Sequence, residues 1–85
     1  MREQAINADG TRRDIAPANG TDYSLRELQE LVGGFIELVQ LDDEWLLVVN
    51  EEGLVFESPL NPIASYLAQQ QIVGNVALVR QRSVR

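Results

Sequence analysis

The residues of this chain that could do chemistry are carboxylates and amides, because the sequence contains no histidine, cysteine or lysine. Without histidine it lacks the usual proton shuttle and the commonest metal ligand, and without cysteine it forms neither disulfides nor thiolate metal sites. We therefore expect no enzymatic activity, no cofactor and no structural or catalytic metal site. The oxygen ligands that remain favour magnesium or calcium, and only weakly.

The acids are concentrated in the middle of the chain. Residues 22–57 hold ten acids and one arginine, a net charge of −9 within a chain whose total is −6. This segment would repel phosphates, so we expect no direct nucleic-acid binding. It would attract and steer a basic protein partner. The first candidates for such contacts are the acids of two predicted turns, whose spacing does not match an EF-hand loop: Asp42, Asp43, Glu44, Glu51 and Glu52.

Five further positions each allow two interpretations. Gly33 and Gly34 could bring backbone amides near an anion, but they follow a predicted helix, where a left-handed glycine commonly ends it. Glu37 lies between apolar residues on one strand face, either as a functional carboxylate or as an edge residue open to solvent. Asn50 and Asn61 could form a polar ligand cluster, although a turn and a helix N-cap explain both.

The elements that must position these residues are centred on residues 31–53. A capping box at Ser24 and Glu27 predicts the start of the first helix. The segment 45–49 is apolar on both faces, as expected of a strand inside a sheet. Gly53 suits a left-handed position in the turn that follows the strand over 45–49. In chain order we predict a helix over about 24–32, strands over 35–41, 45–49 and 54–56, a helix over 62–70 and a strand over 76–79.

These elements predict an α+β fold with a small antiparallel sheet. Its centre is a three-strand meander over 35–57, which the C-terminal strand joins, and two short helices pack on one face. Residues 1–21 form either a weakly structured arm or a hairpin around Asp9-Gly10. Residues 22–79 form the single α+β domain, and residues 80–85 form a solvated tail.

Four short motifs carry a resemblance to a known family. They are VGGFIE at 32–37, NEEG at 50–53, LN at 60–61 and GN at 74–75. The combination resembles V-G-G-[FY]-[IV]-E, N-E-[ED]-G, L-N and G-[DN] in an uncharacterised family, a domain of unknown function found in short proteins of bacteriophages and conjugative plasmids. The match covers about residues 24–79. It implies a mobile-element setting and no established activity.

Two classes of function agree with these observations. The first is a small acidic, non-enzymatic protein of a mobile genetic element that binds a basic host protein, in counter-defence or host takeover. The second is an oligomeric binder that sequesters a small ligand such as a nucleotide signal, although Arg26 is the only cation near the loops concerned. Its pocket would be lined by Gly33, Gly34, Asn50, Glu51 and Asn61. A structural accessory role is a further alternative.

Location and assembly follow from simpler features. No apolar run approaches the ~20 residues of a membrane span, and the first residues do not begin a signal peptide, so we expect a cytoplasmic protein of a bacterial or archaeal host and no membrane contact. The chain is small for its apolar content, and a three-strand meander leaves a sheet edge that a second copy could cover. We therefore expect a homodimer.

Overall fold

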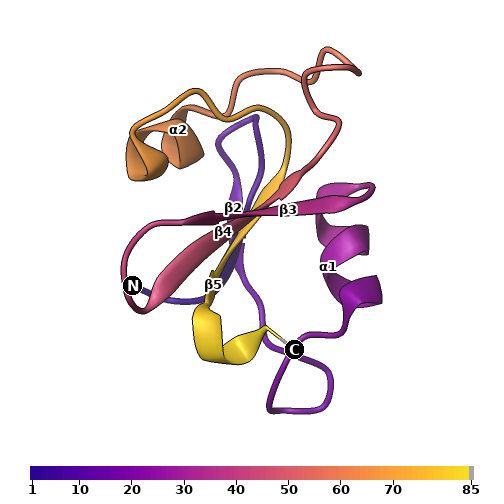
Figure 1. Cartoon of the computed structure of the whole chain (residues 1–85), viewed down its shortest axis with the longest axis vertical. Coiled ribbons are helices and arrows are strands. Elements are labelled where there is room, and N and C mark those ends of the chain that lie inside the picture. The colour runs from indigo at the N-terminus through magenta and orange to yellow at the C-terminus, as the bar shows by residue number, and fades with distance from the viewer. Residues whose placement is uncertain (85) are drawn as a thin grey trace.

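The computed structural model describes residues 1–84 of the 85-residue chain. Within this range, a five-stranded antiparallel sheet is combined with two α-helices, and the predicted α+β class is confirmed (Figure 1). The spatial order of the strands is β2-β1-β5-β4-β3. The elements are β1 (Gln4–Ile6), β2 (Arg12–Asp14), α1 (Leu25–Val32), β3 (Ile36–Gln40), β4 (Trp45–Asn50), α2 (Pro62–Ala68), β5 (Val76–Arg80) and a short 3₁₀ helix at Gln81–Ser83.

The N-terminal segment is a hairpin that belongs to the main sheet. β1 lies between β2 and β5, and its Ala5 and Ile6 are buried in the core. The connecting turn holds Gly10 at φ +93°, a conformation that glycine adopts without steric penalty. The hairpin predicted from Asp9-Gly10 therefore supplies the strand that covers the outer edge of β5.

The prediction that residues 54–56 form the third strand of a meander is wrong. Residues 54–56 lie in a series of turns, and β5 occupies the place beside β4, with Leu47 opposite Leu78. β4 is buried along Trp45–Val49, so it needs a neighbour on each edge, and β5 offers a strand whose first four residues are buried. Residues 54–56 instead satisfy their backbone locally: the Phe56 amide donates to the Glu52 carbonyl, 3.0 Å away.

The two helices pack on opposite faces of the sheet, so the prediction that both share one face is also wrong. Leu28 of α1 lies in one core cluster with Leu46 and Val48, whereas Ala64 of α2 lies in the other cluster with Leu47. Successive strand residues point to opposite faces, so the two clusters lie on different sides of β4. Figure 1 shows α1 and α2 on different sides of the sheet. Because β4 and β5 are apolar on both faces, each face needs its own cover.

The C-terminal residues pack against the domain instead of forming the solvated tail that we expected. Arg80 still belongs to β5, and Ser83 is buried. Val84 forms a parallel bridge with Tyr23, whose amide donates to the Ser83 carbonyl at 2.7 Å. Within residues 80–84, the chain thus closes over the start of α1, and Arg85 lies outside the described residues.

Candidate functional site

Both ends of α1 form as the sequence predicts. The Ser24 hydroxyl accepts from the Glu27 amide, and the Glu27 carboxylate accepts from the Ser24 amide, which completes the capping box. The helix ends at Gly33, whose φ of +82° is left-handed. The amides of Gly33 and Gly34 both donate to the Gln29 carbonyl, at 2.8 and 3.1 Å. The C-cap interpretation is therefore confirmed, and these amides are not free to hold an anion.

Asn50, at the end of β4, joins the end of α1 to the loop that follows β4. Its side-chain amide donates to the Val32 carbonyl at 3.2 Å, and its side-chain oxygen accepts from the Glu52 amide at 2.8 Å. A Cβ on Gly34 would lie 3.0 Å from the Asn50 Nδ2 atom, so a larger residue there would require the Asn50 side chain to shift. One side chain therefore holds two loops together.

We call these two loops, residues 33–35 and 50–57, the tip. In Figure 1 the loop after β4 projects beyond the end of the sheet. A hollow of about 360 Å³ lies between the two loops. Four of its lining residues are site residues predicted from the sequence: Gly33, Gly34, Asn50 and Glu52. The others are Gln29, Phe35 and Phe56.

The tip presents four apolar side chains to solvent. Phe35 is 63% exposed, Leu54 74%, Val55 75% and Phe56 68%. Sequence reasoning missed Leu54, Val55 and Phe56 because it assigned 54–56 to the third strand of the meander, and it placed Phe35 in the strand over 35–41. The signal that could have identified them is their position: three apolar residues lie between acids, with Gly53 before them and a proline shortly after.

Gly53 anchors the base of the loop, although not in the left-handed conformation that we expected. It is absent from the positive-φ residues of the described chain, and Glu57 takes a left-handed φ of +54° instead. Gly53 is buried, and a Cβ there would lie 2.9 Å from the Val73 Cγ2 atom. The glycine is needed for close packing against the segment before β5, and this contact fixes where the loop leaves the sheet.

The acidic turn Asp42–Glu44 lies at the opposite end of the β3–β4 hairpin. Asp42 accepts with one carboxylate oxygen from the amides of Glu44 and Trp45, both at 2.8 Å. Glu44 lies 3.7 Å from Arg80, whose guanidinium stacks over the Trp45 ring with its central carbon 5.0 Å from the ring centre. β3 has five residues, so about 17 Å separates this turn from the tip. The predicted acids therefore form two separate groups.

Asn61 serves the fold and is not available to a ligand. It is fully buried; its side-chain amide donates to the carbonyls of Ile6 and Gly74, and its oxygen accepts from the Ala64 amide at the start of α2. Because every polar atom of this side chain has a partner, the predicted polar cluster of Asn50 and Asn61 does not form. The N-cap interpretation is confirmed.

Glu37 is the second residue of β3, the strand at one edge of the sheet, and its side chain is exposed. Together with Glu51 and Leu54 it lines a hollow of about 200 Å³ on the face that α2 covers. The interpretation of an edge residue open to solvent therefore holds.

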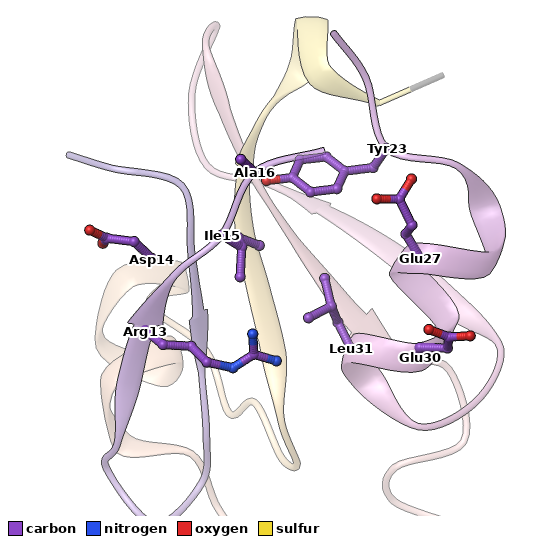
Figure 2. A pocket seen from close by; sticks show the side chains of 8 residues that line it. All are labelled: Arg13, Asp14, Ile15, Ala16, Tyr23, Glu27, Glu30 and Leu31. Carbon is purple, nitrogen blue, oxygen red and sulfur yellow. The ribbon is translucent and has the colours of Figure 1, made fainter. Parts of the chain in front are cut away.

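A third hollow, which no sequence pattern indicated, is a groove of about 410 Å³ between β2 and α1 (Figure 2). Tyr23 at its end is 1% exposed; burial, reinforced by the nearby Glu3 carboxylate, raises the pKa of the Tyr23 hydroxyl. Figure 2 shows Arg13 and Glu30 on opposite walls. Its charged lining consists of one cation, Arg13, and three acids, Asp14, Glu27 and Glu30. Only the fold brings its two walls together.

Two further findings concern the described residues as a whole. Within 1–84, no group of three or more acids is arranged to hold a metal ion. In the same range, neither helix has the length and apolar character needed to cross a membrane.

Two of the four motifs that carry the family resemblance, VGGFIE at 32–37 and NEEG at 50–53, build the tip. The family model for a domain of unknown function, DUF3846, matches residues 5–83. This chain belongs to the DUF3846 family. The match is wider than the resemblance in the motifs, because it also includes the N-terminal hairpin and the 3₁₀ helix. No curated protein matches the chain, and no solved structure matches it either. Membership in DUF3846 assigns no activity to the chain.

Proposed function

We propose that this protein is a non-enzymatic binding module that docks on a basic protein partner through its tip. The observation that carries the proposal is the exposure of four apolar side chains on two adjoining loops: Phe35, Leu54, Val55 and Phe56. Exposed aromatic and aliphatic side chains of this kind typically mark protein interaction sites. A partner that covers these side chains would remove their apolar surface from water, which is favourable.

The charge of the tip indicates the chemistry of the partner. The two loops hold Glu51, Glu52 and Glu57 and no cation. A surface that combines an apolar slot with a rim of lysine or arginine is complementary to this arrangement, because opposite charges steer association and exclude acidic competitors.

The tip is also held in place before any partner arrives. Asn50 fixes it to α1, and Gly53 packs its base against Val73. A loop that is already ordered loses less conformational entropy on binding, which favours affinity. This order supports a recognition role for the apolar side chains.

The resemblance to bacteriophage and conjugative-plasmid proteins supports a mobile genetic element as the setting. The partner that we propose is accordingly a host protein in the bacterial or archaeal cytoplasm, bound in the course of counter-defence or host takeover.

The alternative, sequestration of a small ligand, has one observation in its favour. The hollow of about 360 Å³ at the tip falls in the size range of ligand sites. Its lining includes Glu52 and no cation, so the phosphates of a nucleotide would find repulsion there. The tip therefore favours a protein partner over a nucleotide signal.

The test compares the tip with an equally exposed aromatic residue elsewhere. The variant Val55→Ser/Phe56→Ser should lose affinity for the partner by about 30-fold or more, because truncation of a buried aromatic anchor such as Phe56 often costs ~2 kcal/mol. The control is Tyr66→Ser on α2, where the side chain is 83% exposed. Proteins retained by immobilised wild type from host-cell extract are identified by mass spectrometry, and the affinity of each purified candidate is measured with all three forms.

The proposal is supported only by a partner that loses affinity for the tip variant, keeps it for the control, and binds more weakly as salt rises. If every retained protein binds the tip variant as well as wild type, docking through the tip is wrong. Native mass spectrometry of the purified protein addresses the alternative, since a retained small molecule that survives in wild type and is lost on Asn50→Ala would favour the ligand binder.

A further inference from the structure

The two edges of the sheet differ in chemistry. β2 forms one edge with Arg12, Arg13 and Asp14, all charged and all exposed. β3 forms the other edge with five residues and a single charge, Glu37. Charged and very short edge strands discourage pairing with another chain, whereas longer, uncharged ones invite it. The β3 edge is therefore the one open to strand pairing.

The backbone groups that β3 directs away from β4 can be identified from its end contacts. The Glu51 amide donates to the Phe35 carbonyl at 2.9 Å, and the Leu41 amide donates to the Trp45 carbonyl at 3.0 Å. Hydrogen bonding alternates along an antiparallel strand, so odd-numbered residues of β3 bond to β4. The amides and carbonyls of Ile36, Leu38 and Gln40 then point outward, along the free edge.

We propose that this edge pairs with β3 of a second copy of the chain, antiparallel and about a two-fold axis at Leu38. In this register the two Leu38 residues face each other, and Ile36 faces Gln40 of the second copy. Each of these is a hydrogen-bonded pair, because the outward backbone groups of one strand meet those of the other. The two sheets then become one continuous sheet.

The side chains fit the same register. Leu38 is 48% exposed and Phe35 is 63% exposed in the single chain. Pairing about Leu38 places Phe35 opposite Leu41 of the second copy, so both exposed apolar side chains gain apolar cross-strand neighbours. Glu37 falls opposite Val39 of the second copy, and no like charges meet directly.

Neighbouring registers are less favourable. Moving the axis to Glu37 would place the two Glu37 carboxylates directly opposite each other, which is destabilising. Moving it to Val39 would place Leu38 opposite Gln40 and Phe35 opposite Asp43 of the second copy, leaving the apolar side chains without apolar neighbours. Glu37 thus sets the register, which is a role that its exposed edge position permits.

The test uses the absence of cysteine from the native sequence. Hydrogen-bonded pairs have Cα atoms about 5.5 Å apart, within the range of about 4.4–6.8 Å that a disulfide spans. Leu38→Cys should therefore form a disulfide-linked dimer on mild oxidation. Glu37→Cys should link much more slowly, because its counterpart lies diagonally across the pair, and Tyr66→Cys on α2 serves as the exposed control.

Sedimentation gives an independent readout. Wild type should sediment at twice the 9.5 kDa chain mass at tens of micromolar, and Leu38→Lys should sediment as a monomer because it sets two ammonium groups face to face. Tyr66→Lys, which adds the same charge elsewhere, should remain dimeric. Circular dichroism of each variant reports whether the fold is kept.

The outcomes distinguish this proposal from docking through the tip. Phe35 belongs to both surfaces, but the tip variant changes only Val55 and Phe56, and Leu38 lies outside the tip. Dimer loss in Leu38→Lys and partner loss in the tip variant are therefore separate results. Faster linkage of Glu37→Cys than of Leu38→Cys would overturn the register. A monomeric wild type, or a Leu38→Cys protein that links no faster than Tyr66→Cys, would overturn the interface.

Discussion

The two ends of the β3–β4 hairpin look alike in sequence and differ in structure. Both are acidic turns, Asp42–Glu44 at one end and Glu51–Glu52 at the other. At the first end the acids are occupied with the fold, since Asp42 closes the turn and Glu44 pairs with Arg80. At the second end the fold depends on Asn50, and the acids surround exposed apolar side chains.

The difference teaches that acidic charge by itself does not mark a binding site. Where a carboxylate accepts backbone hydrogen bonds in its own turn, that structural role is enough to explain the acidic residue. The tip is the proposed site because its acids lie beside apolar side chains that residues 1–84 of a single chain leave exposed. Separation matters too, since about 17 Å is twice the Debye length of about 8 Å at physiological salt, so the two acidic groups act independently.

The largest effect on stability that the comparison predicts is at Asn50. Asn50→Ala removes the hydrogen bond to the Val32 carbonyl of α1 and the one from the Glu52 amide within the tip, and should lower the free energy of unfolding by about 2–3 kcal/mol. Asn50→Asp keeps the acceptor for the Glu52 amide and should lose less. Chemical denaturation measures the difference, and amide exchange should show residues 51–57 losing protection. Unchanged stability in Asn50→Ala would remove the anchoring role.

A smaller effect is expected on the rate of partner association, which should depend on the acids of the tip and not on those of the turn Asp42–Glu44. Converting Glu51, Glu52 and Glu57 to glutamine should slow association with a basic partner by about tenfold at low salt, because steering charges act mainly on the association rate. Converting Asp42, Asp43 and Glu44 to their amides should change the rate by less than about twofold at ~0.15 M salt, because screening isolates that end. Stopped-flow association measures both. Equal slowing would mean that the partner contacts both ends.

The smallest effect distinguishes two neighbours within the acidic turn. Asp42→Ala removes an acceptor for two backbone amides and should lower the free energy of unfolding by about 1 kcal/mol. Asp43 is exposed and makes no hydrogen bond or ion pair within residues 1–84. The free energy of unfolding of Asp43→Ala should therefore stay within about 0.5 kcal/mol of the wild-type value. Thermal unfolding of the two variants side by side measures this, and a larger loss at Asp43 would contradict the assignment of the turn.

Much of the candidate site could be predicted from the sequence, because four of its residues act through short-range signals. Gly33 and Gly34 end a helix, and Asn50 and Glu52 lie in a turn, and all four line the hollow at the tip. Phe56 could not be placed in this way. Three apolar residues in a row fit a short buried strand as well as an exposed loop, and only competition for the edge of β4 decides between them.

The sequence by itself determined the features that depend on neighbouring residues: the capping box at Ser24, the left-handed end at Gly33, the N-cap at Asn61 and the apolar character of β4. These follow from local hydrogen bonds and side-chain periodicity. Only the tertiary structure decided that β5 lies beside β4, that the helices cover opposite faces, and that residues 54–56 remain outside. The physical reason is that burial is shared out over the whole chain: β4 could accept one more neighbour, and the longer, more apolar β5 took that place.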